Sequence, residues 1–227
     1  MAAGEGTRLR PLTERWAKPV LPIDGKPVVA RLLRELAAAG FDEVTVVTGH
    51  LAAQVEALLG DGSGFGCRIR YVRQPGVLGS ADAVLRAGAA APYLVTAADT
   101  LFTEGDIERF WSAFAESGAD GAVAARRDPP PSPPHRYALR IEEGVVRDVL
   151  DRDPGNGLAA APLWALGPAL QPILEALPGK APYELATVFQ EAIVSGLRIA
   201  GVEIGKTRDL THPEDVVVEN FPYLGST

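Results

Sequence analysis

The chain has 227 residues, of which 47% are hydrophobic and 22% charged, and its formal net charge is −7 at pH 7. This length suffices for a buried core, and the composition is typical of globular proteins rather than of disordered chains. A negative net charge without a basic stripe disfavours binding to nucleic acid, which requires clustered Lys and Arg. No apolar run approaches the ~20 residues of a membrane span, and nothing resembles a signal peptide. We therefore expect a cytoplasmic protein with no membrane partner.

Helical and strand patterns alternate through the first half of the chain. The expected helices have apolar residues at helical spacing, and the expected strands are short and rich in β-branched residues. In chain order we expect a helix over 27–40, a strand over 44–49, a helix over 51–60, a strand over 67–74, a helix over 80–91, a strand over 92–99 and a helix over 107–117. This alternation predicts a three-layer α/β fold with a mostly parallel sheet and helices on both faces.

The pattern changes in the second half. A strand over 120–126 precedes the proline-rich segment DPPPSPPHR (128–136), which cannot lie inside a sheet. The segment YALRIEEGVVRDVL (137–150) predicts a hairpin that turns at Glu-Glu-Gly. Further elements are expected as helices near 168–177 and 183–195, a strand over 197–205 and a closing helix over 212–221. We expect a single domain over residues 1–227 with an antiparallel insertion in its second half.

The segment GEGTRLRPLTERWAKPVLP (4–22) is rich in glycine and in basic residues. Backbone amides at Gly4 and Gly6 can approach a phosphate closely because no Cβ intervenes, and the Thr7 hydroxyl adds a donor. Arg8 and Lys18 supply positive charge suited to phosphate oxygens. A Gly-x-Gly pair alone is weak evidence, because it also marks ordinary surface turns.

The longer string AAGEGTRLRPLT, followed after a short gap by KPVLPIDGKP, resembles the signature of the sugar-1-phosphate nucleotidyltransferases. These enzymes are the nucleotide-sugar pyrophosphorylases, such as glucose-1-phosphate thymidylyl- and uridylyltransferases. Four further segments resemble the family in the same order, namely RYVRQPGVLGSADAV, PYLVTAADTLF, YELATVFQEAI and RDLTHPEDV. The resemblance implies a fold of the nucleotide-diphosphosugar transferase type. It also implies magnesium-dependent transfer of a nucleotidyl group from an NTP, with dTTP or UTP favoured, to a sugar 1-phosphate.

The resemblance also implies roles for individual residues. Arg8 and Lys18 would be catalytic, because they would hold the triphosphate and neutralise the phosphates in the transition state. Asp99 and Asp209 would hold Mg²⁺, which typically takes one or two carboxylates plus substrate phosphates. The residues implied to bind the nucleotide are Ala3, Gly4, Gly6, Thr7, Gln74 and Gly79, of which the last two would read the base.

The start of the chain departs from the family pattern. The family has a short hydrophobic strand before AAGEGTRL, at the centre of its sheet, where this chain has only Met1 and Ala2. We therefore expect the first strand to be missing or truncated, with neighbouring backbone groups left unpaired. One hypothesis is that the true start lies upstream of Met1.

The sugar side of the family pattern is less well kept. DRDP (151–154) stands where the family has Glu-Lys-Pro, and Pro162 stands where a flexible residue is expected. The candidate sugar-phosphate residues are Tyr137, Arg152, Trp164 and Glu184, although the two aromatic residues could equally belong to the core. Two alternatives therefore stay open: a cytidylyltransferase acting on phosphocholine or an inositol phosphate, and a non-catalytic nucleotide-binding regulatory domain. The sequence does not indicate the oligomeric state.

Overall fold

The computed structural model describes residues 1–132, 136–153 and 155–221, so part of the proline-rich segment lies outside the described residues. The chain divides into two compact units. The first unit comprises Met1–Val77, Ala97–Leu101 and Arg208–Thr227, and the second comprises Leu78–Thr96 and Phe102–Thr207. Within the described residues, no helix is long and apolar enough to cross a membrane. The expectation of a single domain stays a prediction.

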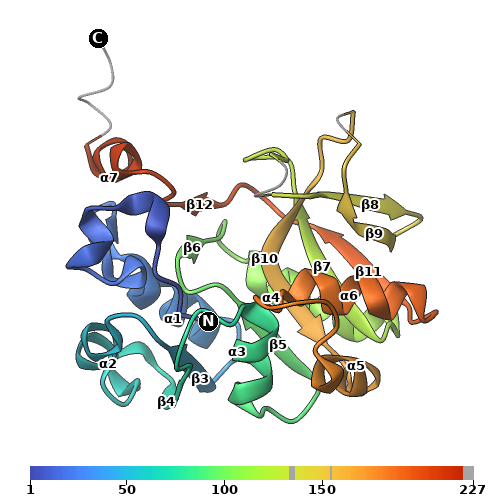
Figure 1. Cartoon of the computed structure of the whole chain (residues 1–227), viewed down its shortest axis with the longest axis horizontal. Helices are drawn as coiled ribbons and strands as arrows, with labels where there is room; N and C mark the ends of the chain where they lie inside the picture. The colour runs from blue at the N-terminus through green and yellow to red at the C-terminus, as the bar shows by residue number, and fades with distance from the viewer. Residues whose placement is uncertain (133–135, 154, 222–227) are drawn as a thin grey trace. The chain divides into compact units, whose positions relative to one another are not determined.

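The first unit contains the parallel strand pair that the sequence predicts. Strands β3 (Glu43–Thr48) and β4 (Arg68–Arg73) pair in parallel, with Glu43 opposite Arg68. Parallel neighbours need a crossover connection, and helix α2 (Ala52–Leu59) lies in this one (Figure 1). Helix α1 (Val28–Ala38) precedes β3, and its buried apolar residues follow a helical period, as its sequence pattern predicts.

Short elements complete the first unit. Three 3₁₀ turns, η1 (Thr7–Leu9), η2 (Leu12–Glu14) and η3 (Lys18–Val20), run through the glycine-rich segment. The remaining strands form two antiparallel pairs, β1 (Pro22–Ile23) with β2 (Lys26–Pro27) and β6 (Thr100–Leu101) with β12 (Arg208–Asp209), and helix α7 (Pro213–Asn220) follows. One hydrophobic cluster joins these elements, and its members are Leu9, Leu21, Ile23, Val28, Leu101 and Leu210, with Val216 packed against them.

The second unit is built on a six-stranded sheet in the order β5-β10-β7-β11-β9-β8 (Figure 1). Its strands are β5 (Tyr93–Thr96), β7 (Gly121–Arg126), β8 (Ala138–Glu142), β9 (Val145–Asp151), β10 (Ala159–Leu166) and β11 (Ile199–Glu203). Its helices are α3 (Ser80–Ala87), α4 (Asp106–Ser117), α5 (Gln171–Ala176) and α6 (Leu185–Val194), and the 3₁₀ turn η5 (Pro168–Leu170) precedes α5. A further 3₁₀ turn, η4 (Ser63–Phe65), belongs to the first unit. The predicted 137–150 hairpin is confirmed as β8 and β9, and it turns at Glu143 and Gly144, both with positive φ.

The α/β class is confirmed, but the prediction of a mostly parallel sheet is wrong. In the six-stranded sheet only β7 and β11 pair in parallel, and the other pairings are antiparallel. The reason is the apolar segment 159–166, which forms β10 and runs antiparallel between β5 and β7. Because Pro162 has no N–H to donate, the register of β10 against β7 shifts between Ala160 and Trp164.

The first three residues pair with two segments of the first unit. Ala2 donates its N–H to the Val47 carbonyl (2.7 Å), and it forms a parallel bridge with Thr48. On the other side, the Met1 carbonyl accepts from the Ala98 N–H at 2.9 Å. The Val47 carbonyl and the Ala98 N–H are therefore paired, whereas we expected backbone groups beside the truncated first strand to be left unpaired.

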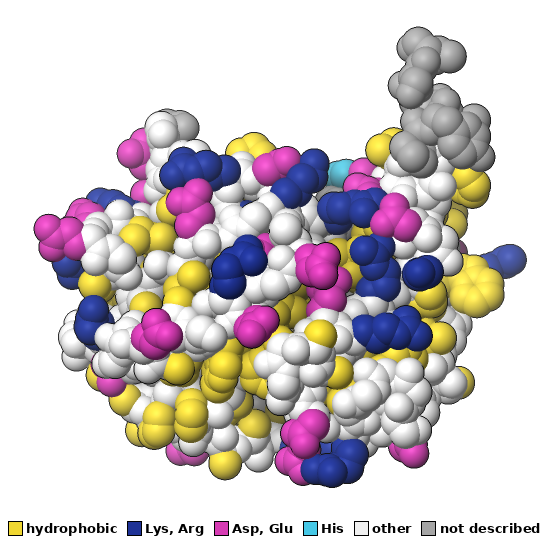
Figure 2. Space-filling model, turned by 180° about the vertical axis from the view of Figure 1, so that it is seen from behind, with side chains coloured by type: hydrophobic (Ala, Val, Ile, Leu, Met, Phe, Trp, Pro, Cys, Tyr) yellow, Lys and Arg dark blue, Asp and Glu magenta, His cyan; other side chains and the backbone are white. Residues whose placement is uncertain are grey.

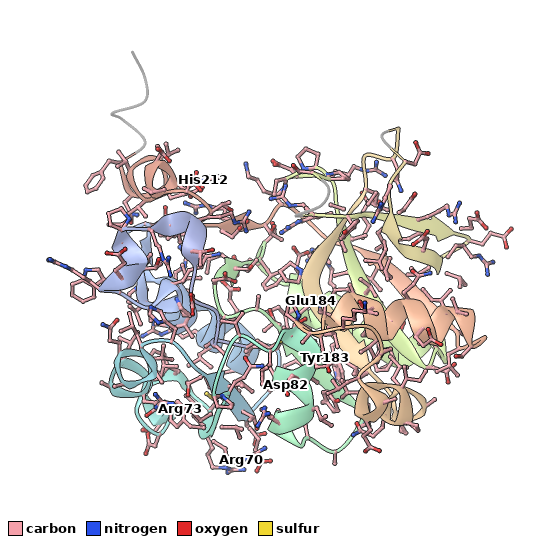
Figure 3. All side chains as sticks on the ribbon, in the orientation of Figure 1. Arg70, Arg73, Asp82, Tyr183, Glu184 and His212 are labelled. Atoms are coloured by element: carbon pink, nitrogen blue, oxygen red, sulfur yellow. The ribbon has the colours of Figure 1, made fainter. Side chains whose placement is uncertain are left out.

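Charged side chains of both signs are interspersed on the molecular surface drawn in Figure 2. On β4, which carries Arg70 and Arg73 (Figure 3), the neighbouring Arg68 pairs with Glu43 across the strands at 2.7 Å. The expectation that the protein does not bind nucleic acid stays a prediction.

An ionic network anchors α7 to the β1–β2 turn. Arg208 donates to both carboxylate oxygens of Asp24 (2.8 and 2.9 Å) and to Glu219 through its Nε (2.7 Å). The Arg208 hydrogen bond is the main reason why the pKa of Asp24 lies well below its usual range. Asn220 adds hydrogen bonds to the Pro22 carbonyl and the Gly25 N–H, both at 2.8 Å. The network therefore fixes β12 against the hairpin turn.

We expect Arg208→Met to lower the free energy of unfolding by ~1–2 kcal/mol, because it removes charge-assisted hydrogen bonds to two carboxylates. The folded-state pKa of Asp24 is depressed, so the difference in the free energy of unfolding between variant and wild type should be largest above about pH 4. It should decrease as the pH falls further. Urea unfolding at several pH values measures it. The control is Arg68→Met, whose ion pair with Glu43 is 74% and 75% exposed, so it should lower the stability much less than Arg208→Met. Equal losses in the two variants would contradict the anchoring role.

Candidate nucleotide-binding site

The glycine-rich segment folds into a tight loop that requires glycine at position 6. Gly6 has a φ of 62°, and a Cβ there would lie 2.9 Å from Cγ2 of Thr13. The Thr13 hydroxyl donates to the Gly6 carbonyl at 2.8 Å, and Thr13 is buried. The stem of Lys18 also approaches this point, since its Cβ would lie 3.4 Å from the added atom. Absence of a side chain at Gly6 therefore lets Thr13 and Lys18 close the loop.

Gln54 of α2 and His50, which precedes that helix, hold the loop from outside. Gln54 accepts from the Ala17 N–H through Oε1 (2.8 Å) and donates to the Arg15 carbonyl through Nε2 (2.6 Å). Nε2 of His50 lies 2.7 Å from the Thr13 carbonyl, so it donates to that oxygen as the Nε2–H tautomer. Sequence reasoning gave neither residue a role, because these partners lie 37 to 39 positions apart in the chain. Together they fix the backbone just before Lys18.

Lys18 and Asp99 form an ion pair within the first unit. The Lys18 Nζ and an Asp99 carboxylate oxygen lie 2.5 Å apart, and the two side chains are only 15% and 26% exposed. Burial opposes ionisation of Asp99, but the Lys18 ammonium outweighs it and holds the pKa of that carboxyl below its usual range. The Asp99 carboxylate is therefore ionised at neutral pH, beside the glycine loop.

The two aspartates implied as metal ligands lie on paired segments. Asp209 pairs with Thr100 in the β12–β6 ladder, so its backbone lies next to that of Asp99. The Asp209 carboxylate accepts from the Thr211 hydroxyl at 3.0 Å. Among the described residues, no group of three or more His, Cys, Asp or Glu side chains could hold a metal alone. Two carboxylates nevertheless fit Mg²⁺, which takes its remaining ligands from water and substrate phosphates.

Other residues implied to bind the nucleotide also belong to the first unit. Thr7 and Arg8 are exposed at η1, and Arg8 makes no ion pair within the described part of the chain. Gly4 is open, since no atom lies within 4 Å of where a Cβ would be. The Ala3 carbonyl is engaged by the His50 N–H at 3.3 Å. The segment therefore presents the exposed Arg8 and an open backbone position at Gly4.

Gln74 and Gly79, the two residues implied to read the base, fall in different units. Gln74 belongs to the first unit, directly after β4, and its side chain is buried. Its backbone N–H donates to the Thr48 carbonyl at 2.8 Å. Gly79 belongs to the second unit, has a φ of 96° and comes directly before α3. Their joint role in base readout stays a prediction.

The candidate sugar-side residues belong to the second unit and differ in exposure. Trp164 is buried and packs on Phe189 with ring centroids 4.8 Å apart, so it is part of the core. Tyr137 is half-buried, and the exposed Arg152 guanidinium lies over its ring at 6.0 Å from the centroid. Glu184 is exposed directly before α6. Exposure therefore favours Tyr137, Arg152 and Glu184 over Trp164 as residues that can contact a ligand.

We expect Gln54→Leu to loosen the loop, because it leaves the Ala17 N–H and the Arg15 carbonyl without their side-chain partner. The free energy of unfolding should fall by ~1–3 kcal/mol, and trypsin should cut faster after the exposed Arg15. Time courses of limited proteolysis under native conditions measure this. The control is Gln171→Leu, whose side chain bonds Glu175 on the surface, far along the chain from Arg15, and which should leave the cleavage unchanged. Unchanged cleavage after Arg15 in Gln54→Leu would mean that Gln54 does not hold the loop.

Comparison with known proteins agrees with these features. A curated relative, the low-salt glycan biosynthesis nucleotidyltransferase of Haloferax volcanii, is 29% identical over 97% of this chain and 64% of its own length. The N-acetylmuramate alpha-1-phosphate uridylyltransferase of Neisseria meningitidis is 35% identical over 70% of this chain and 69% of its own length. The chain thus spans about two thirds of the length of these relatives.

A solved structure shows the same fold. A Bacillus anthracis protein assigned as a glucose-1-phosphate thymidylyltransferase superposes with a TM-score of 0.83, covering 96% of this chain and 91% of that one at 20% identity. The family model described as nucleotidyl transferase matches residues 1–139, which include the glycine loop, Lys18 and Asp99. The chain therefore belongs to the nucleotidyl transferase family.

Proposed function

We propose that the protein is an enzyme that transfers a nucleotidyl group from a nucleoside triphosphate to a sugar 1-phosphate, giving an NDP-sugar and pyrophosphate. The observation that carries the proposal is the Lys18–Asp99 ion pair beside the tight glycine loop. A lysine and a carboxylate at the edge of an anion-binding loop serve both a triphosphate and the cation that accompanies it. The relatives that are named as uridylyl- and thymidylyltransferases support UTP or dTTP as the donor.

The reaction requires positioning and charge neutralisation rather than a general base. A phosphate oxygen of the acceptor is already anionic at neutral pH and attacks the α-phosphorus of the NTP. The bond from the α-phosphorus to the bridging oxygen breaks, and pyrophosphate leaves with that electron pair. Charge develops on the phosphoryl oxygens, so cationic and N–H donors held in place lower the barrier.

Each residue of the loop has a role in this proposal. The amides of Gly4, Gly6 and Thr7 hold the phosphates, and Arg8 stabilises the departing pyrophosphate. Lys18 bridges the attacking phosphate and the triphosphate. Gln74 and Gly79 read the base, and Ala3 contributes backbone contacts to the nucleotide.

Mg²⁺ is the cation that this donor set suits. Asp99 and Asp209 would hold it, and when bound it would neutralise phosphate charge and polarise the α-phosphate. Lys18 pairs with Asp99, so its ammonium compensates the charge of that carboxylate. With Mg²⁺ held by Asp99, the lysine would be available for phosphate.

We expect pyrophosphate release with Mg²⁺ for one pair of NTP and acceptor. The panel is dTTP, UTP, CTP, GTP and ATP against sugar 1-phosphates, an inositol phosphate and phosphocholine. Product formation from UTP or dTTP with a sugar 1-phosphate would support the proposal and identify both substrates. Transfer only to phosphocholine or inositol phosphate from CTP would favour the cytidylyltransferase alternative. Nucleotide binding without turnover on any acceptor would favour the regulatory alternative.

We expect Lys18→Gln and Asp99→Asn each to lower kcat by at least ~100-fold, because each removes a charge placed to act on the phosphates. Steady-state kinetics measures kcat, and circular dichroism verifies the fold. The matched control is Lys206→Gln, which removes a lysine whose ion pair with Asp128 is 62% and 57% exposed. It should retain wild-type kcat. Near-normal kcat in Asp99→Asn would remove Asp99 from the mechanism.

A further inference from the structure

We propose that Ser80 is a positioning residue for the acceptor, because its hydroxyl orients the carboxylate of Glu184 toward hydroxyl groups of the bound sugar. The inference rests on the proposed function and deepens it. It concerns residues of the second unit only, where the turn before α3 meets the turn before α6.

The Ser80 hydroxyl makes two hydrogen bonds, one as acceptor and one as donor. It accepts a hydrogen bond from the Leu185 N–H at 2.7 Å and lies 2.6 Å from Oε2 of Glu184. The amide can only donate, so the hydroxyl must donate to the carboxylate. A hydrogen bond to a charged acceptor is stronger than a neutral one, and here it fixes one oxygen of Glu184.

The backbone around this contact is clamped on both sides. The Ala81 N–H donates to the Tyr183 carbonyl and the Tyr183 N–H donates to the Leu78 carbonyl, both at 2.8 Å. A Cβ at Gly79 would lie 2.2 Å from the Tyr183 carbonyl oxygen, so the two turns touch through their main chains. Figure 3 shows Tyr183 and Glu184 beside the first turn of α3, where Asp82 is labelled. Glu184 is therefore held on a rigid base, and only its side-chain torsions need fixing.

The second carboxylate oxygen of Glu184 is available for a ligand. Glu184 is exposed and makes no ion pair among the residues that the structure describes. It lies where α3 and α6 begin, and the positive ends of helix dipoles stabilise a carboxylate. A carboxylate without a cationic partner repels phosphate but accepts hydrogen bonds from hydroxyl groups. The geometry thus suits the polyol part of a sugar 1-phosphate rather than its phosphate.

The test compares Ser80→Ala with Ser80→Thr, which restores the hydroxyl. With the productive sugar 1-phosphate as substrate, Ser80→Ala should raise the KM for the acceptor about 5-fold or more, since a hydrogen bond of this kind contributes roughly 1 kcal/mol. The KM for the NTP should change less than about 2-fold, because the backbone clamp remains. Ser80→Thr should recover most of the acceptor KM. A role in stability alone would not separate the two KM values.

A double-mutant cycle with Glu184→Ala tests whether Ser80 acts through Glu184. The double variant should have the acceptor KM of Glu184→Ala alone, because Ser80 has nothing left to orient. Ser80→Cys, which keeps the size and donates weakly, replaces Ser80→Ala in the cycle if the alanine variant does not fold. An unchanged acceptor KM in an active Ser80 variant, or fully additive effects, would overturn this inference alone. A wild-type protein that transfers to no acceptor would instead overturn the proposed function, and the Ser80 role with it.

Discussion

The candidate site depends on a small hydrophobic cluster that anchors a glycine-rich loop. Leu9 and Leu21, both in the glycine-rich segment, pack with Leu101 and Leu210, and all four are buried. Each buried leucine contributes ~1.5–3 kcal/mol relative to exposure, which offsets part of the entropy lost by ordering a loop without long regular elements. Leu101 and Leu210 lie one or two positions after the two aspartates. The same apolar contacts therefore bring Asp99 and Asp209 to the loop.

Hydrogen bonds around the loop add to the anchoring by the hydrophobic cluster. Gln54 and His50 fix the main chain before Lys18, and Thr13 closes the loop onto Gly6. Lys18 then has little freedom, and its ammonium pairs with Asp99. The surrounding contacts thus hold the positive and negative groups of the candidate site in place, as the proposed electrostatic catalysis requires. In the proposed acceptor site, the Ser80 hydroxyl fixes the Glu184 carboxylate, much as Gln54 fixes the backbone that carries Lys18.

The sequence predicted the local elements well because their signals are local. The helices at 28–38 and 106–117 and the hairpin at 138–151 follow from apolar period and turn residues. The direction of β10 could not be predicted, because an apolar run of eight residues does not reveal which neighbours it pairs with.

The same division applies to the site. A contiguous motif pointed to Gly6, Arg8 and Lys18, whereas the supporting contacts of Gln54 and Ser80 join residues 37 and 104 positions apart. Trp164 shows the limit of assignment by position, since it is buried against Phe189. Whether an aromatic residue faces a pocket or the core is decided by packing across the sheet, which a single sequence does not encode locally.

The most direct test of the central claim is the position of a metal ion in crystals grown with Mn²⁺ and a non-hydrolysable UTP or dTTP analogue. Anomalous scattering locates the Mn²⁺ independently of the protein density. The account predicts one ion coordinated by Asp99 and Asp209, with the triphosphate on the amides of the 4–7 segment and Lys18 in contact with its phosphates. A triphosphate bound away from this segment, or an ion that contacts neither aspartate, would contradict it.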